Sequence, residues 1–324
     1  MSNTTSLTQT SSAPKTRVLV FGPTGQVGRY VALTAHRVGA HVTLAMRDPS
    51  KPISSLAGNG TEEQNFPRVK ADLTDPASLT TAVTSTQSTH AFLYLPFNTP
   101  DFMRSAAEAL RSAGITFVVF LSSSTITTSI DSVTPTHPIS YGHAQVEKNL
   151  RDVFGPGGYV AIRGGYFASN TKLWKAQLAS GEMKIKCAEA RFDFISGEDV
   201  GSVAGVILAK GPKAVEGKGY IEVVGNTLIS QREAAGILGR VLGKQLKFAE
   251  PDEEEVVRDI MRDMHCPEPV ARYISGVLEA REKEEDGMYE GVRYEEGGKN
   301  IERFLGRVQI PFEAWAEENK ELFL

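Results

Sequence analysis

The sequence predicts an α/β fold, a doubly wound parallel sheet with a smaller C-terminal substrate-binding cap, from three observations. Residues 17–47 read as an apolar strand, a glycine-rich turn, an amphipathic helix and a second apolar strand. Strand and helix patterns then alternate to about residue 230, the order that builds parallel βαβ units. From residue 253 the patterns are helical. We therefore expect a sheet domain with a helical unit over its strand ends.

The turn between the first strand and the first helix predicts a dinucleotide site of the Rossmann type. Gly22 lets the chain turn off the strand, Gly25 lets the backbone approach a pyrophosphate, and Gly28 lets the helix pack close to the sheet. The pyrophosphate would lie over N–H groups at the positive end of the helix. The alternative is a tight turn that binds no ligand. The position of the three glycines between an apolar strand and an amphipathic helix favours nucleotide binding. The expected contacts are Gly22, Thr24, Gly25, Gln26, Val27 and Gly28.

The end of the second strand favours NADP(H) over NAD(H). An NAD site normally has a carboxylate about 20 residues after the first glycine, where it holds the ribose 2′-OH. This chain instead has Arg47, with Lys51 one helical turn later. A guanidinium suits a 2′-phosphate, which it grips through two N–H groups. We expect Asp48 to cap a short helix that begins at Pro49.

Composition indicates an ordinary globular protein and excludes several classes. The chain has 324 residues, of which 41% are hydrophobic and 23% charged, and its net charge is −4. The absence of a basic block argues against nucleic acid as a partner, and no apolar run reaches the roughly 18 residues of a membrane helix. Two cysteines exclude a disulfide framework and make the cytoplasm the default. The six histidines have no metal-ligand spacing, so we expect no metal.

The remaining elements are expected at the following positions. Strands are predicted at 68–73, 90–95, 115–121, 159–163, 192–195 and 220–224. Helices are predicted at 78–83, 102–113, 141–153, 199–208, 253–264, 270–278 and 311–319. The charged, glycine-rich segment 281–300 is expected to be an exposed excursion. The predicted division is a disordered leader at 1–14, an NADP-binding domain at 15–155 continued by 190–230, and a cap at 156–189 and 231–324.

Polar residues after the central strands are candidates for chemistry, because ligands of open α/β sheets lie at this edge. One of Ser122, Ser123 and Ser124 is expected to contact the nicotinamide or the substrate; capping of the loop is the alternative. Tyr141 is a candidate proton donor or an aromatic that packs at the helix start. His143 is expected to hydrogen-bond the nicotinamide ribose or to act as an acid near pH 7, unless it lies on the helix surface.

Other strand ends supply candidate contacts for the cofactor and the substrate. Tyr166 and Phe167 are predicted walls of the pocket, although packing between sheet and cap would place them similarly. Further cofactor contacts are expected from Asp72, Leu73, Leu95 and Pro96. Further substrate contacts are expected from Phe97, Met103, Asn170 and Trp174.

These motifs together resemble the NmrA-like atypical short-chain dehydrogenases/reductases. The resemblance covers nearly the whole chain after residue 15. It is carried by the glycine turn, Arg47, Ala71–Pro76, His143–Glu147, Ile162–Asn170 and Phe194–Val200. The tail segments PDEEEVVRDIMRDM and GRVQIPFEAWAEENK look most like the fungal branch that contains the ergot-alkaloid iminium reductases. Membership implies a Rossmann fold, NADP(H), and small-molecule chemistry in fungal secondary metabolism.

The chain departs from the pattern of short-chain dehydrogenases at their catalytic pair. In those enzymes a Tyr polarises the carbonyl, and a Lys four residues later lowers its pKa and holds the ribose. Here His143 stands at the lysine position and Ile139 at the tyrosine position. This loss argues against ordinary ketone–alcohol exchange. It suits reduction of an iminium, which needs no proton donor, or of an enone, which needs less help than a ketone.

Two hypotheses of function follow. The first is an NADPH-dependent reductase of an iminium, imine or conjugated C=C bond in an alkaloid-like small molecule, with or without coupled cyclisation. The second is an NAD(P)-binding redox sensor that acts through a protein partner without turnover. The missing Tyr–Lys pair favours the sensor, whereas the aromatic Gly-Gly-Tyr-Phe stretch at 164–167 favours the enzyme. The sequence leaves the oligomeric state open.

Overall fold

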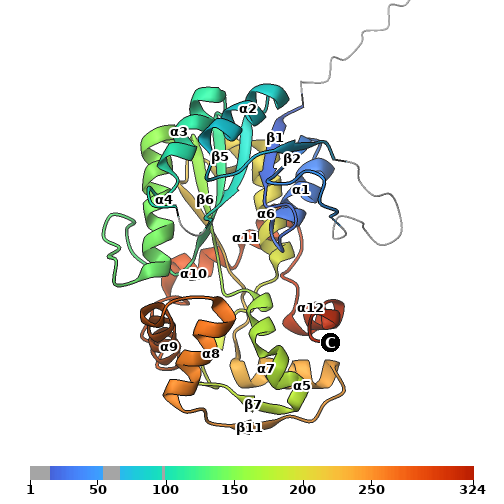
Figure 1. The fold of residues 1–324 in the computed structure, drawn as a ribbon, viewed down its shortest axis with the longest axis vertical. Helices are drawn as coiled ribbons and strands as arrows, with labels where there is room; N and C mark the ends of the chain where they lie inside the picture. Colours follow the sequence, from blue (N-terminus) through green and yellow to red (C-terminus); the bar gives the residue numbers. More distant parts are fainter. Residues whose placement is uncertain (1–14, 54–65, 97–98) are drawn as a thin grey trace, which may run out of the picture.

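The computed structural model describes residues 15–53, 66–96 and 99–324. Its upper part is a seven-stranded, fully parallel sheet with the order β3-β2-β1-β4-β5-β6-β9 (Figure 1). The strands are β1 Arg17–Phe21, β2 His41–Met46, β3 Arg68–Lys70, β4 His90–Tyr94, β5 Phe117–Ser123, β6 Tyr159–Gly164 and β9 Tyr220–Val223. The predicted Rossmann-type fold is confirmed. The strand order reverses between β1 and β4, which is where such sheets bind ligands.

Helices cover both faces of this sheet. Helices α1 (Gly28–Arg37) and α6 (Gly197–Lys210) lie on one face (Figure 1). The other face carries α2 (Pro76–Thr86), α3 (Arg104–Ala113) and α4 (Pro138–Phe154). Each face buries its own apolar cluster, because a parallel strand is apolar on both sides. The strands are therefore held rigidly, and their carboxyl ends point toward the lower part of the molecule.

The lower part is a smaller cap with a core of its own. It contains η2 (Ala168–Trp174), α5 (Lys175–Ser180), α7 (Gln231–Val241), α8 (Glu253–Met264), α9 (Glu268–Glu282) and α12 (Phe312–Glu318) (Figure 1). Two small sheets complete it, in which β7 (Glu182–Lys184) pairs with β11 (Lys247–Ala249) and β8 (Arg191–Phe192) pairs with β10 (Ile229–Ser230). Its core is rich in aromatic side chains.

Several predicted boundaries were wrong for local reasons. Helix α3 begins at Arg104 rather than at residue 102, because Phe102 and Met103 have left-handed backbone angles of φ 48° and 62°. The strand expected at 192–195 ends at Phe192 and pairs in the cap, and Phe194 also has a positive φ of 38°. The domain boundary expected at residue 155 falls too early, since β6 lies inside the large sheet.

The expected exposed excursion at 281–300 was also wrong. Met288 and Tyr289 are buried, and so is Arg281, which forms an ion pair with Asp286 at 2.6 Å. Helix α10 (Gly291–Gly297) packs against β9, and the following α11 (Asn300–Leu305) packs against α6. Two arginines of the segment, Arg281 and Arg293, are therefore paired with acids inside the fold, and the segment joins the cap to the edge of the large sheet.

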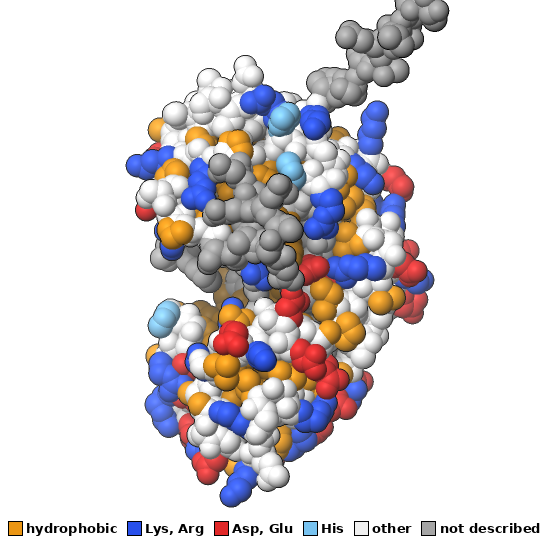
Figure 2. All heavy atoms as spheres, turned by 90° about the vertical axis from the view of Figure 1, so that its right-hand side faces the viewer, with side chains coloured by type: hydrophobic (Ala, Val, Ile, Leu, Met, Phe, Trp, Pro, Cys, Tyr) orange, Lys and Arg blue, Asp and Glu red, His pale blue; other side chains and the backbone are white. Residues whose placement is uncertain are grey.

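The cap part of the face that carries α12 has charged side chains of both signs (Figure 2). Figure 2 shows acidic and basic side chains together over the cap part of this face, below a constriction between the two parts. Among the described residues, no helix is long and apolar enough to cross a membrane. The same residues contain no group of three or more His, Cys, Asp or Glu side chains that could hold a metal ion.

Candidate functional site

The glycine-rich turn is built as a strand-to-helix anion site. Gly22 has a φ of 67°, which a residue with a side chain adopts only with strain. A Cβ atom on Gly28 would overlap the carbonyl oxygen of Gly22, so the first turn of α1 closes tightly on the strand. Thr24, Gly25 and Gln26 are exposed between these two residues. The turn therefore presents its backbone to solvent at the carboxyl end of β1.

The N-terminus of α1 has donors available for a ligand. Within the described residues, the amides of Gln26 and Val27 donate to no backbone or side-chain acceptor. The helix has no side-chain cap and no acidic residue in its first turn. A helix start of this kind attracts an anion through free N–H groups and the helix dipole. The predicted contacts of this turn thus lie together on one exposed ridge.

Arg47 lies at the end of β2, exposed and outside any ion pair of the described residues. The residues described after Asp48 form a turn rather than the expected helix, although the Asp48 carboxylate accepts hydrogen bonds from the backbone and hydroxyl of Ser50, at 2.9 and 2.6 Å, as a capping residue would. Lys51 is exposed in the same turn. The guanidinium of Arg68 fixes this turn from β3, since it donates to the carbonyls of Pro49 and Lys51 at 3.1 and 3.0 Å.

The predicted contacts at the third and fourth strand ends are mostly occupied by the protein itself. The Asp72 carboxylate accepts hydrogen bonds from the amide and the hydroxyl of Thr74, at 2.9 and 2.8 Å. The side chain of Leu73 is buried in the core, which leaves its backbone for a ligand. Leu95 and Pro96 are half-buried beyond β4. Phe97 lies outside the described residues.

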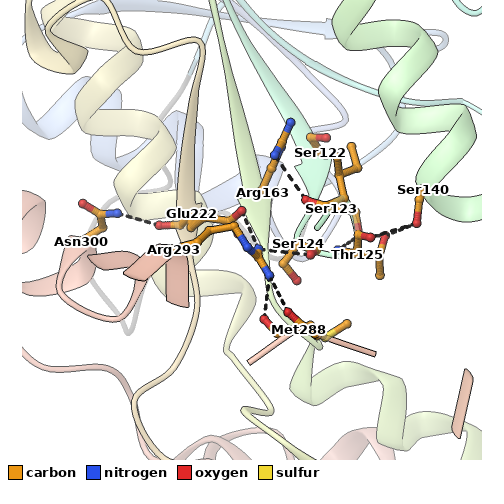
Figure 3. A network of polar contacts seen from close by, with 12 residues as sticks. Ser122, Ser123, Ser124, Thr125, Ser140, Arg163, Glu222, Met288, Arg293 and Asn300 are labelled. Carbon is orange, nitrogen blue, oxygen red and sulfur yellow. Dashed lines mark hydrogen bonds and ion pairs between the residues drawn. The ribbon is translucent and has the colours of Figure 1, made fainter. Parts of the chain in front are cut away.

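The serines after β5 have three different environments (Figure 3). The hydroxyl of Ser122 is buried and donates to Glu147 at 2.6 Å, which leaves only its backbone for the predicted cofactor contact. Ser123 shares a hydrogen bond of 2.9 Å with the hydroxyl of Thr125. The hydroxyl of Ser124 is buried without a partner among the described residues, while its carbonyl accepts from Arg293 at 3.3 Å.

Two buried ion pairs lie next to the serines and hold the ends of the neighbouring strands. Arg163 on β6 forms two hydrogen bonds with Glu147 on α4, at 2.8 and 3.1 Å, and the two side chains are only 4% and 2% exposed. Arg293 on α10 binds the carboxylate of Glu222 on β9 at 2.7 Å, as Figure 3 shows. Burial raises the pKa of Glu222 to about 7, against the lowering effect of Arg293. The network ties α4, three strands and the cap segment to the loop after β5.

His143 is half-buried on α4. Its Nδ1 atom lies 2.9 Å from the carbonyl oxygen of Ile139 and must carry the proton, because a carbonyl only accepts. Burial lowers the pKa of His143, so the ring is neutral near pH 7. Its Nε2 atom is then an acceptor. This protonation state agrees with a hydrogen bond to a ribose hydroxyl and contradicts the predicted role as an acid near pH 7.

Two other candidates, Tyr141 and Met103, pack against side chains of the fold. Tyr141 packs edge-to-face on Phe102, with ring centroids 5.6 Å apart, and its role as a proton donor stays a prediction. Met103 is buried in the core between the sheet and α2–α4, so the prediction that it lines the substrate pocket was wrong. A methionine at a helix start fits either role, so its position in the chain does not reveal this burial.

The aromatic residues after β6 lie where the sheet and the cap meet. Tyr166 stacks on Phe192 with centroids 4.1 Å apart, and burial raises its pKa to about 12 while a hydrogen bond with Asn170 acts in the opposite direction. Phe167 is half-buried against the sheet core. Trp174 is buried in the cap core beside Phe194, and its predicted place on the pocket wall stays a prediction.

Residues 14–308 match the family model described as the NmrA-like family. The chain belongs to this family. It is 34% identical to the nitrogen metabolite regulation-like protein bik4 of Gibberella fujikuroi, over 93% of this chain and 95% of that protein. It is 28% identical to a (4-alkanoyl-5-oxo-2,5-dihydrofuran-3-yl)methyl phosphate reductase of Streptomyces griseus, over 94% of this chain and 99% of that protein.

Solved structures agree on the fold of this NmrA-like chain. The NADPH-dependent quinone oxidoreductase QOR2 of Escherichia coli, crystallised with NADPH, superposes with a TM-score of 0.71 at 18% identity. The match covers 93% of this chain and 99% of that one. The broader resemblance to NmrA-like proteins is thus confirmed. The narrower one, to the ergot-alkaloid iminium reductases, stays a prediction.

Sequence reasoning missed a carboxylate that joins the two parts of this NmrA-like protein. Asp193 is buried and accepts hydrogen bonds from the amides of Tyr166 and Gly225 and from the hydroxyl of Tyr289, at 2.8, 2.8 and 2.7 Å. Burial raises the pKa of Asp193 to about 6, against these bonds. The sequence contains a signal for this residue, because an Asp between Phe192 and Phe194 places a charged side chain inside an aromatic segment.

Proposed function

We propose that the protein is an NADP(H)-dependent reductase of a small molecule whose acceptor is an iminium, imine or conjugated C=C bond. Two features occurring together support this proposal. The first is the exposed glycine turn followed by Arg47, and the second is that Ile139 and a neutral His143 stand where related dehydrogenases have their catalytic Tyr and Lys. The first fits a phosphorylated dinucleotide. The second offers no strong acid for an alkoxide.

The described residues fit both negatively charged groups of NADP(H), the diphosphate and the 2′-phosphate. The free amides of Gln26 and Val27 suit the diphosphate, and Gly28 permits the close approach of turn and helix that this requires. Arg47 would hold the 2′-phosphate, with Lys51 beside it and Arg68 keeping their turn in place. A bound nicotinamide supplies the hydride.

The other residues orient and enclose rather than exchange protons. His143 would accept a hydrogen bond from the nicotinamide ribose through Nε2, in place of the lysine of related dehydrogenases. Ser123, with its hydroxyl tied to Thr125, and the aromatic residues Tyr166 and Phe167 would form the polar and apolar walls of the pocket. Orientation in a dry pocket suffices when the acceptor carbon is already electrophilic.

Turnover with matched acceptors tests this proposal. The purified protein would be mixed with NADPH and, in turn, a cyclic iminium, an enone and the corresponding saturated ketone, and oxidation of NADPH followed by its absorbance. We expect stoichiometric oxidation with the iminium or the enone and none with the ketone. Reduction of the ketone as fast as the others would contradict the argument from the missing proton donor.

The redox sensor is the second candidate, and the relative named as nitrogen metabolite regulation-like favours it. Such a protein would bind dinucleotide without oxidising it and would bind a protein partner more tightly in one redox state. The named substrate of the Streptomyces relative, an unsaturated lactone that carries an acyl group, favours the reductase and the conjugated C=C acceptor. If the protein binds the dinucleotide but reduces no acceptor of any class, the result would favour the redox sensor over the reductase.

The alkaloid-like setting and a coupled cyclisation belong to the same proposal. They rest on the likeness of the tail segments at 251–264 and 306–320 to the fungal iminium reductases. Product analysis by mass spectrometry after reduction of an amino-aldehyde, which forms its iminium by ring closure, tests them together. A linear product would exclude assisted cyclisation.

A further inference from the structure

A pocket on the α1–α6 face adjoins the outer side of the glycine turn. It is formed by the turn itself, by the first residues of α1 and α6, by η2 and by the C-terminal helix α12. Two basic side chains line it, Arg29 one helical turn after Gln26 and Lys172 from η2, and the hydroxyl residue Ser169 lies between sheet and cap beside them. The mechanism proposed above uses none of these three side chains.

Arg29 is held in place but is not neutralised. Its Nη2 atom donates to the hydroxyl of Tyr30 at 2.9 Å, and the guanidinium lies over the Tyr30 ring, 4.5 Å from its centroid. Its Nε atom is buried and has no hydrogen-bond partner within the described residues. A buried, unsatisfied N–H of a charged group is costly unless a ligand accepts it. Arg29 is thus oriented with a donor to spare.

Lys172 brings a second positive charge to the same pocket. No ion pair joins either Arg29 or Lys172 to a carboxylate in the part of the chain that the structure describes. The pKa of Lys172 is lowered, first by partial burial and then by the charge of Arg29. Two acids, Glu198 and Glu318, also line the pocket, and Glu198 pairs with Arg307 at 3.6 Å.

Like charges that face one pocket repel each other, and an anion bound between them relieves that repulsion. The available donors are a guanidinium, an ammonium, a hydroxyl and the amides of an exposed turn, a set typical of phosphate sites. We propose that Arg29 and Lys172 form a phosphate-binding subsite at the outer side of the glycine turn, separate from Arg47. Its occupant is either the diphosphate of the dinucleotide or a phosphate group of the second ligand.

The test uses the full chain and two substitutions that keep the aliphatic stem, Arg29→Met and Lys172→Met. Arg37→Met, in the exposed last turn of the same helix, and Lys213→Met, on an exposed surface of the sheet domain, are the matched controls. Calorimetry measures the affinity for NADPH, for NADH, and for inorganic phosphate added to protein already saturated with NADPH. Circular dichroism checks that each variant is folded.

Each expected outcome assigns the occupant. If the diphosphate occupies the subsite, both variants weaken NADPH and NADH by the same factor, at least tenfold, and leave their ratio unchanged. If a second ligand occupies it, dinucleotide affinity stays the same, and the NADPH-loaded variants lose the phosphate binding that the loaded wild type shows. Variants that match the two controls in all three titrations would overturn the proposal, and so would a change confined to the ratio of NADPH to NADH.

This inference rests on the proposed function only for the cofactor arm. Phosphate binding to an Arg47→Ala protein without dinucleotide is measured in the same way and needs no turnover. Loss of that binding in the Arg29→Met and Lys172→Met backgrounds supports the subsite even when no acceptor is reduced. Phosphate binding that persists in both backgrounds contradicts it, whatever the result of the turnover assay.

Discussion

Removal of Glu147 tests the buried network behind the site. The carboxylate forms two hydrogen bonds with Arg163 and accepts one from Ser122, and both charged side chains are almost fully buried. In Glu147→Leu the guanidinium of Arg163 keeps only the Ile126 carbonyl at 3.3 Å and the Tyr220 ring at 3.9 Å. Loss of one partner of a buried pair costs about 3–5 kcal/mol, so we expect a loss of about 3 kcal/mol in the free energy of unfolding, since these two contacts remain.

Urea unfolding followed by circular dichroism measures this loss. The control is Glu108→Leu, which breaks the exposed pair with Arg104 and should change stability by about 0.5 kcal/mol or less. The double variant Glu147→Leu/Arg163→Met removes both buried charges and should recover about 2 kcal/mol of the single variant's loss. A single variant as stable as the control, or a double variant as unstable as the single one, would refute the reasoning.

Two further predictions concern the glycine turn and a buried acid. Gly28→Ala should abolish dinucleotide binding in a fluorescence titration because its Cβ would overlap the Gly22 carbonyl, whereas Gly236→Ala, which meets nothing within 4 Å on α7, should bind normally. Glu222 has a folded pKa of about 7 against an ordinary 4.5, so the folded protein retains a proton that the unfolded chain releases between these values. Its contribution is therefore largest below pH 4.5 and falls by about 3 kcal/mol as the pH rises to 7. Glu222→Gln, whose amide replaces the unpartnered oxygen, should flatten this slope in unfolding curves from pH 4 to 8; a slope equal to that of wild type would contradict it.

The sheet was predictable from the sequence because its signals are local. The apolar runs at β1, β2 and β5 and the glycine turn fix a strand–helix–strand unit with few alternatives. The same locality placed Arg47 at an exposed strand end. Helix α8 was predicted with its observed bounds, since Asp252 caps it and its apolar stripe is regular.

The remainder depends on contacts that are distant in sequence. Nothing near Arg163 shows that its partner is Glu147, 16 residues earlier, although a charge at the end of an apolar strand requires one. Residues 281–300 look exposed by composition, and only the positions of Asp286 and Glu222 in space explain why Arg281 and Arg293 are paired there. The state of His143 likewise depends on burial, which periodicity alone does not give.

The central claim is that Arg47 makes this an NADP(H) site, and paired titrations test it most directly. Wild type and Arg47→Ala would be titrated with NADPH and with NADH, with intrinsic fluorescence as the signal. We predict NADPH binding at least tenfold tighter than NADH binding, about 1.4 kcal/mol, and loss of that preference in Arg47→Ala with NADH affinity unchanged. Equal binding of the two dinucleotides by wild type, or a preference that survives the substitution, would contradict it.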